Sequence, residues 1–270
     1  MPDRAVNSIL MSADTVGGVW TFALELTRAL AAYNANISLA TMGRKLDAGQ
    51  WREANRISNL EIFESDFKLE WMDNPWDDVR RAGDWLLSLE ARIKPDVVHL
   101  NTLVHGALPW TAPTLLTGHS CVLSWWQAVK REQAPPEWDR YRVEVARSLN
   151  AAGLITAPTR AMLDELREQY DFSADAVVVP NGAEPPRCNA VKEPLILAAG
   201  RLWDEGKNIA ALDRIASLLP WPVYLAGEKG AASSATMLGR ISSEELAHWY
   251  ARASIYCLPA RYEPFGLSIL

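Results

Sequence analysis

Short apolar runs alternate with longer amphipathic segments along this chain, and this alternation constrains the fold more than any other feature. The runs have strand length, while the segments between them, such as residues 19–32, repeat apolar side chains at helical spacing. Strands that alternate with helices form parallel sheets whose two faces are both covered by helices. The pattern therefore predicts an α/β protein built from doubly wound parallel sheets.

The alternation occurs in two series, separated by a proline-rich seam. Residues 184–194 contain three prolines and few apolar side chains, as is typical of a linker between domains. We expect a first domain at 1–184, a linker at 185–194 and a second domain at 195–270, the two domains facing each other across a cleft. The predicted strands are 8–12, 37–41, 60–63, 97–100, 114–117, 154–156, 177–179, 195–199, 223–226, 236–238 and 255–258. The predicted helices are 19–32, 76–93, 137–152, 160–170, 208–219 and 242–251.

Composition narrows the class of protein. The 270 residues are 49% hydrophobic and 22% charged, which is a globular rather than a disordered composition. A net charge of −6 argues against nucleic acid as the main partner. Three widely separated cysteines form no C-x-x-C pair, which argues against a disulfide framework or structural zinc. Without a signal peptide or a membrane-length apolar run, we expect a cytoplasmic protein.

Several well-known motifs are matched only in part or are absent. Residues 200–208 resemble a phosphate-binding P-loop, but five residues separate the glycines and Asn208 stands where Ser or Thr is needed. Residues 118–122 resemble a hydrolase elbow, but Val122 replaces its second glycine. No G-x-G-x-x-G, D-x-D or H-E-x-x-H sequence occurs, so we expect no nicotinamide cofactor and no metal ion.

Two features near strand ends favour an anionic ligand. Gly17 and Gly18 lie between a predicted strand and a predicted helix, where the backbone can approach an anion at the helix N-terminus. An ordinary tight turn is the alternative. Arg201 and Lys207 follow the strand 195–199, and two cations at the carboxyl end of a strand suit a diphosphate. A solvated charged turn would give the same spacing.

Two further features are candidates for contact with a sugar. Glu263-Pro-Phe-Gly266 follows the last predicted strand, where a carboxylate can accept sugar hydroxyls and the amides of residues 265–268 can face a phosphate. Alternatively, Glu263 only complements a helix dipole. His119 follows the strand 114–117 and is either a site residue or a structural histidine. We expect His99 and His105 to be structural and His248 to lie on the surface.

Together these residues resemble the retaining glycosyltransferases of the GT-B fold, in particular glycosyltransferase family 4. The stretches that carry the resemblance occur in the family's order and cover nearly the whole chain. They are Asp14-Thr-Val-Gly-Gly-Val19, Pro95-Asp-Val-Val-His-Leu100, His119, Pro180-Asn-Gly182, Ala199-Gly-Arg-Leu202 with Lys207, Leu238-Gly-Arg-Ile-Ser242, and Leu258-Pro-Ala-Arg-Tyr-Glu-Pro-Phe-Gly-Leu-Ser-Ile-Leu270.

The resemblance implies two Rossmann-like domains, with acceptor bound by the first and a nucleotide-diphosphate sugar by the second. It implies that the catalytic residues are His119, Arg201, Lys207 and Glu263. Arg201 and Lys207 would hold the diphosphate, Glu263 the sugar hydroxyls, and His119 the reacting sugar. Further donor contacts would come from Gly17, Gly18, Gly239, Arg240, Phe265, Gly266 and Leu267. The family generally needs no metal, so we expect no cofactor, and the leaving phosphate itself would assist the acceptor hydroxyl.

The chain departs from the family pattern in several places. The family's second glutamate, which holds the ribose, would fall at position 271, so the second domain is expected to be incomplete and to expose apolar surface. Asn208 and Trp20 stand where glycine and glutamate are common. Trp125 and Trp126 form either a sugar-stacking wall or part of the core.

Three functions therefore remain open. The first is a retaining transferase that moves a sugar from a nucleotide-diphosphate donor to a hydroxyl acceptor. The second is a truncated, non-catalytic sugar- or nucleotide-binding protein. The third is a related GT-B epimerase that acts on the nucleotide sugar itself. The family habit allows peripheral membrane contact, although no strongly basic amphipathic helix is present.

Overall fold

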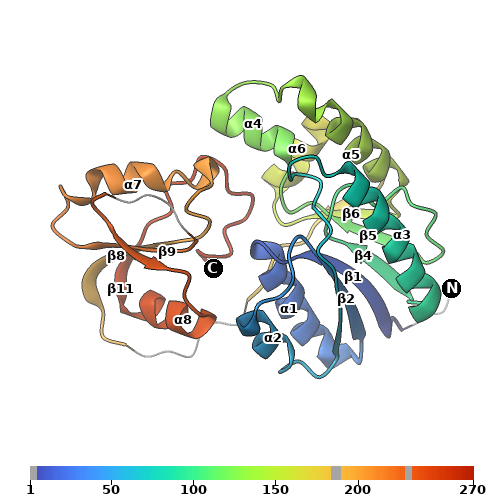
Figure 1. Ribbon diagram of the computed structural model, residues 1–270, viewed down its shortest axis with the longest axis horizontal. Coiled ribbons are helices and arrows are strands. Elements are labelled where there is room, and N and C mark those ends of the chain that lie inside the picture. Colours follow the sequence, from blue (N-terminus) through green and yellow to red (C-terminus); the bar gives the residue numbers. More distant parts are fainter. Residues whose placement is uncertain (1–4, 184–189, 229–232) are drawn as a thin grey trace. The chain divides into compact units, whose positions relative to one another are not determined.

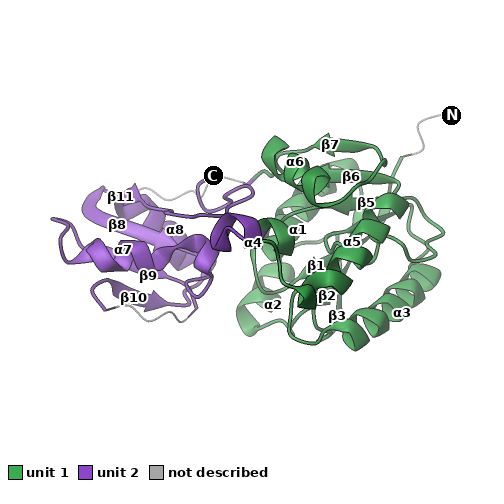
Figure 2. Cartoon of the chain, turned by 90° about the horizontal axis from the view of Figure 1, so that it is seen from above, with its two compact units in different colours: residues 1–124, 133–182 green, residues 125–132, 183–270 purple. Residues whose placement is uncertain are grey.

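The computed structural model of the protein describes residues 5–183, 190–228 and 233–270 (Figure 1). It divides into two compact units, coloured separately in Figure 2. Unit 1 comprises residues 1–124 and 133–182, and unit 2 comprises residues 125–132 and 183–270. Residues 185–189 of the expected linker lie outside the described residues, and its end already belongs to a strand.

Unit 1 contains a seven-stranded parallel sheet in the order β3-β2-β1-β4-β5-β6-β7. Its strands are β1 Ser8–Asp14, β2 Asn36–Met42, β3 Leu60–Glu64, β4 Val97–Leu100, β5 Thr114–Thr117, β6 Leu154–Ala157 and β7 Ala176–Val178. Its helices are α1 Gly18–Leu30, α2 Ala48–Ala54, α3 Trp76–Ile93, α5 Asp139–Ala151 and α6 Arg160–Gln169, with 3-10 turns η1 Ala31–Tyr33 and η2 Pro136–Trp138. Helix α4, Val122–Lys130, begins in unit 1 and continues into the segment assigned to unit 2.

Alternate residues of β1 pack into different cores, which explains why both faces of this sheet carry helices. Ile9 and Met11 belong to the cluster that holds Leu24 of α1, whereas Leu10 belongs to the cluster that holds Leu86 of α3. Met11 and Leu10 are 0% and 1% exposed, so each side chain contributes roughly 1.5–3 kcal/mol through burial. A strand that is buried on both faces has apolar residues at successive positions. The apolar residues within 8–12 therefore predicted this strand.

The strand order places a topological switch point in unit 1. From β1 the chain adds β2 and β3 on one side, and later returns to pair β4 with β1 on the other. In doubly wound sheets, ligands bind at the carboxyl ends of the strands that flank such a point. Residues that follow β1, β4 and β5 are therefore candidates for ligand contact.

Unit 2 contains a four-stranded parallel sheet in the order β10-β9-β8-β11. Its strands are β8 Glu193–Ala199, β9 Val223–Ala226, β10 Thr236–Gly239 and β11 Ala253–Tyr256, with helices α7 Ile209–Ala216 and α8 Ser243–Arg252 and the 3-10 turn η3 Glu205–Lys207. The β8 residues alternate between two clusters, as in β1. Together the two units confirm the expected α/β class with two parallel, doubly wound sheets.

A buried carboxylate anchors one loop of unit 2. Asp213 on α7 accepts hydrogen bonds from the backbone amides of Ser233, Ser234 and Ala235 and from the Ser233 hydroxyl. These amides hold the pKa of Asp213 at about 2, below its usual value, because hydrogen bonds to the charged form favour it. The anchor fixes residues 233–235, which lead into β10.

Several element boundaries correct the sequence expectations. The expected helix 208–219 is shorter, because Asn208 adopts a left-handed conformation with φ +53° and α7 ends at Ala216. The expected helix 137–152 is divided into η2 and α5. Helix α2 was not predicted, although Asp47 and Gln50 form a capping box at its start. Trp125 and Trp126 lie within α4, a helix that the sequence did not predict.

Candidate functional site

The candidate residues of unit 1 and their partners lie at the carboxyl ends of three neighbouring strands, β1, β4 and β5. His119 follows β5, and its Nε2 atom lies 2.7 Å from Oδ1 of Asn101, which follows β4. Asn101 is in turn bound to β1, because its Nδ2 atom donates to the Ser12 carbonyl at 2.8 Å and its backbone amide donates to Oγ of Ser12 at 3.0 Å. The switch point is thus bridged by side chains, with His119 at the end of the chain of hydrogen bonds.

A second hydrogen-bonded chain supports the first. Nε2 of His99 lies 2.8 Å from Oγ1 of Thr117, which lies 2.7 Å from Oγ1 of Thr156. Burial lowers the pKa of His99 to about 4. Burial and the neighbouring His99 lower the pKa of His119 to about 3. Both imidazoles are therefore neutral at physiological pH, and the expectation that His99 is structural agrees with its burial.

The glycine turn lies beside these histidines. Asp14 accepts the backbone amides of Val16 and Gly17, which shapes the turn between β1 and α1. Gly17 is the N-cap residue of α1 and makes no side-chain cap, so the first amides of the helix are available to an anion. Phe22, one turn further along α1, contacts the His119 ring edge-on with centroids 4.5 Å apart. Gly17 and Gly18 thus lie at the junction of β1 and α1, as the sequence predicted.

The charged candidates of unit 2 gather after β8. Lys207 forms an ion pair with Glu263, with Nζ and Oε2 2.5 Å apart and both side chains largely buried. Arg201 forms a second pair with Asp204 at 3.0 Å. The two cations that the sequence assigned to a diphosphate both follow β8, and each has its own carboxylate partner: Asp204 for Arg201 and Glu263 for Lys207.

Asp204 organises the turn that carries Lys207. It is buried, and Oδ1 accepts the backbone amide of Gly206 at 2.8 Å and Nε1 of Trp125 at 3.0 Å. Gly206 leaves no room for a side chain, since a Cβ there would lie 2.8 Å from Nε1 of Trp125. Lys130, on the same helix as Trp125, pairs with Glu205 at 2.6 Å. The half-buried Trp125 side chain on α4 is therefore a partner of this turn.

The remaining donor candidates lie on neighbouring loops of unit 2. Gly227 approaches the Gly200 carbonyl so closely that a Cβ would lie 2.0 Å from it, and its amide donates to the Gly239 carbonyl. The loops after β8, β9 and β10 are thus joined through backbone. Gly239 has φ +70°, and Arg240 pairs with Glu228 at 3.4 Å.

The Glu263 segment has no helix or strand in the described chain. Gly266 has φ +90° and its carbonyl accepts the amide of Ile269 at 2.8 Å, which closes a turn. Among the described residues, the amides of Phe265, Gly266 and Leu267 have no hydrogen-bond partner, so they remain available to a ligand.

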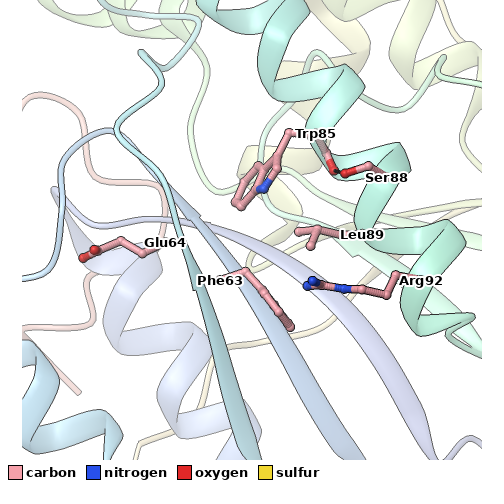
Figure 3. Close-up of a pocket in the computed structure, with 6 residues that line it drawn as sticks. All are labelled: Phe63, Glu64, Trp85, Ser88, Leu89 and Arg92. Atoms are coloured by element: carbon pink, nitrogen blue, oxygen red, sulfur yellow. Dashed lines mark hydrogen bonds between the residues drawn. The ribbon is translucent and has the colours of Figure 1, made fainter.

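A separate hollow of about 390 Å³ lies between β3 and α3 in unit 1 (Figure 3). Its lining residues are Phe63, Glu64, Trp85, Ser88, Leu89 and Arg92. The Arg92 guanidinium lies 4.8 Å from the centre of the Phe63 ring and is thereby engaged in the wall of the hollow. None of the residues that the sequence assigned to the site lines it.

The described residues contain no group of three His, Cys, Asp or Glu side chains that could hold a metal ion. In the same part of the chain, no helix is long and apolar enough to cross a membrane.

Sequence reasoning missed Ser12, Asn101 and Asp204. Asn101 holds the histidine and lies in none of the predicted elements or motifs, whereas Asp204 holds the lysine turn and was considered only as part of the stretch 200–208. A signal for Asn101 was present, because it is the first polar residue after a strand that flanks the switch point. The bond between Trp125 and Asp204 joins positions too distant in sequence for any local pattern to reveal.

Comparison with known proteins agrees with the fold. Sucrose-phosphate synthase from Thermosynechococcus elongatus is 18% identical with a TM-score of 0.70, covering 97% of this chain and 77% of its own. MurG from Acinetobacter baumannii is 17% identical with a TM-score of 0.50, covering 93% of this chain and 72% of its own. UGT89C1 from Arabidopsis thaliana, solved with UDP-L-rhamnose, is 9% identical with a TM-score of 0.58, covering 94% and 74%.

These likenesses show the GT-B fold. No protein of curated description matches the sequence. The family model named Glycosyltransferase Family 4 matches residues 16–187, which is more than half of the chain. With two doubly wound units and this match, the chain belongs to glycosyltransferase family 4.

Proposed function

We propose that this glycosyltransferase retains the configuration of a sugar that it moves from a nucleotide diphosphate to a hydroxyl acceptor. The observation that carries the proposal is the ion pair of Lys207 with Glu263 in unit 2, together with Arg201 and its partner Asp204 in the same segment after β8. Two cations, a carboxylate and the unbonded amides of the neighbouring 265–267 segment match a ligand that has both phosphates and hydroxyls. The Arabidopsis relative in fold carries such a ligand, UDP-L-rhamnose.

Each residue then has a role in the proposed reaction. Arg201 and Lys207 bind the diphosphate and stabilise the negative charge that develops as it leaves. Glu263 accepts hydroxyls of the donor sugar, and the backbone near Gly239 and Arg240 contacts the nucleotide. The bond from the sugar's anomeric carbon to the diphosphate breaks, and a bond to the acceptor oxygen forms on the same face. The acceptor's proton passes to the leaving phosphate oxygen.

In unit 1, the proposed ligand contacts are His119 and the helix start at Gly17 and Gly18. A neutral imidazole accepts a hydrogen bond from a sugar hydroxyl, whereas the uncapped α1 amides favour a phosphate oxygen. In this proposal no residue forms a covalent intermediate, and no metal or other cofactor takes part.

Donor binding is tested by thermal shift with UDP, GDP, ADP and their glucose conjugates. We expect one nucleotide series to raise the melting temperature of the wild-type protein, because a ligand that binds only the folded state stabilises it. Arg201→Ala and Lys207→Ala should abolish the shift, while Arg214→Ala, an exposed cation on α7, should keep it. Equal shifts in all variants would contradict the assigned diphosphate site.

The reaction type needs its own measurement. Incubation with the stabilising donor and a panel of hydroxyl acceptors should give a product whose anomeric configuration, read by NMR coupling, equals that of the donor. Incubation without acceptor distinguishes an epimerase, because only an epimerase would convert the nucleotide sugar itself.

A further inference from the structure

Asn101 makes three hydrogen bonds, and their directions determine the state of His119. Its Nδ2 atom donates to the Ser12 carbonyl at 2.8 Å, an oxygen that can only accept. If the amide were turned over, Oδ1 would face that carbonyl and two acceptors would meet. The backbone amide of Asn101 also donates to Oγ of Ser12 at 3.0 Å, so the residue is fixed on both sides. The amide oxygen must therefore face His119.

The facing oxygen then selects the proton position on the imidazole. Oδ1 of Asn101 lies 2.7 Å from Nε2 of His119 and can only accept, so Nε2 must carry the proton. A neutral imidazole has one proton, which leaves Nδ1 with a free lone pair. Within the part of the chain that the structure describes, Nδ1 of His119 has no hydrogen-bond partner.

The surroundings of His119 keep the ring neutral and oriented. Phe22 packs edge-on against it, with ring centroids 4.5 Å apart and planes at 63°. The titratable group that acts on it is His99, which is buried and whose own Nε2 is engaged with Thr117. A carboxylate bonded to this ring would favour the charged imidazolium, but none of the described residues forms such a bond.

We propose that Asn101 is a positioning residue that holds His119 with its proton on Nε2, so that Nδ1 accepts a hydrogen bond from a hydroxyl group of the bound sugar. The identity of the ligand rests on the proposed function, but the tautomer does not. An acceptor nitrogen pairs with a hydroxyl and not with a phosphate oxygen, so this position selects for the sugar rather than for the diphosphate.

The tautomer is measured directly by long-range ¹H–¹⁵N NMR on the full chain labelled at histidine nitrogen, with His119→Gln to assign the signals. We expect the neutral tautomer with the proton on Nε2 between pH 6 and 8. Asn101→Ala should convert this single pattern into a mixture of tautomers. A proton on Nδ1 in the wild-type protein, or an unchanged pattern in Asn101→Ala, would overturn the proposal.

Asn59→Ala is the matched control. Asn59 also belongs to unit 1, and its Nδ2 atom donates to two backbone carbonyls, those of Thr27 and Ala35. Both substitutions remove hydrogen bonds that tie segments of unit 1 together, but Asn59 does not contact His119. Asn59→Ala should therefore leave the His119 signals unchanged, and an equal change in both variants would show that Asn101 acts only through stability.

The ligand is tested with monodeoxy analogues of the nucleotide-diphosphate sugar that the protein accepts. For one analogue, kcat/KM should fall about tenfold with the wild-type chain and not further with His119→Ala, as for the loss of one hydrogen bond. Absence of such coupling for every analogue would contradict the hydroxyl contact. If the NMR result holds and no donor is turned over, the positioning role stands and the proposed function fails.

Discussion

The polar residues at the strand ends of unit 1 are neutral and joined by hydrogen bonds, whereas those of unit 2 are charged and paired as ions. In unit 1, Ser12, Asn101 and His119 form a continuous network across the switch point. In unit 2, Lys207 pairs with Glu263 and Arg201 with Asp204. The same fold thus presents two chemically different edges.

The difference indicates what each edge does when a ligand arrives. The neutral network is already satisfied, apart from the free nitrogen of His119, so it can receive a hydroxyl without losing a bond. In the proposed reaction the ion pairs are rearranged, because a diphosphate would compete with Glu263 and Asp204 for the same cations. Unit 1 is therefore expected to respond to pH and ligand shape, and unit 2 to ligand charge.

The largest expected effect comes from removing the carboxylate of the Lys207 pair. Glu263→Ala should lower turnover by about 100–1000-fold, because a residue that contacts the reacting sugar contributes about 2.7–4 kcal/mol to the transition state. The same variant should bind the free nucleoside diphosphate at least as tightly, because Lys207 loses a competing partner. Steady-state kinetics and calorimetry measure the two quantities separately.

Glu205→Ala is the control for this comparison. Glu205 lies two residues from Lys207 but pairs with Lys130 and is largely exposed. Its loss should change neither turnover nor diphosphate binding appreciably. If Glu263→Ala loses diphosphate binding as strongly as turnover, the two edges do not divide their work as described.

The pH dependence of stability should differ between the units. The pKa of His99 is lowered to about 4, so the folded state binds fewer protons than the unfolded state, whose histidines titrate near 6.5. Stability from this group is present above pH 6.5 and is lost as the pH falls toward 4, by up to about 1.4 kcal/mol per pH unit. Three of the four histidines, His99, His105 and His119, lie in unit 1.

Unit 2 should keep its stability to lower pH. Its Asp213 has a pKa lowered to about 2, so the contribution of this group persists above its unfolded value near 4 and declines only below it. Urea unfolding, followed by resolved NMR signals of each unit at pH 7 and pH 5, measures both. The fall in unit 1 should shrink in His99→Gln, and equal falls in both units would contradict the assignment.

How far the sequence predicted the fold is clear from β1 and α4. The run 8–12 was readable because a strand buried on both faces is apolar throughout, and hydrophobic periodicity is a local signal. Helix α4 was not predicted, because its two tryptophans were interpreted as a wall or as core. The predicted helix 137–152 is divided because Pro136 starts the 3-10 turn η2, which precedes α5.

The sequence could predict which residues are candidates for the site, but not which of them pair with each other. Lys207, Glu263 and His119 follow predicted strands, and the rule that ligands bind at carboxyl strand ends located them. Their partners required the structure, because Lys207 and Glu263 are 56 positions apart in sequence. The state of His119 depends on Asn101 and Ser12, which lie on two other strands.

The smallest expected effect tests whether surface charge in unit 2 acts like the buried pairs. The Lys130 and Glu205 side chains are 32% and 59% exposed, so water and salt screen their attraction. Lys130→Ala should therefore lower the free energy of unfolding by less than about 1 kcal/mol and leave donor binding unchanged. Thermal melts at low and high salt measure it, and the difference between variant and wild type should shrink as salt is added. A loss as large as that in Lys207→Ala would mean that charge near η3 matters regardless of burial, and the contrast between exposed and buried pairs would then no longer support the proposal that Lys207 binds the donor.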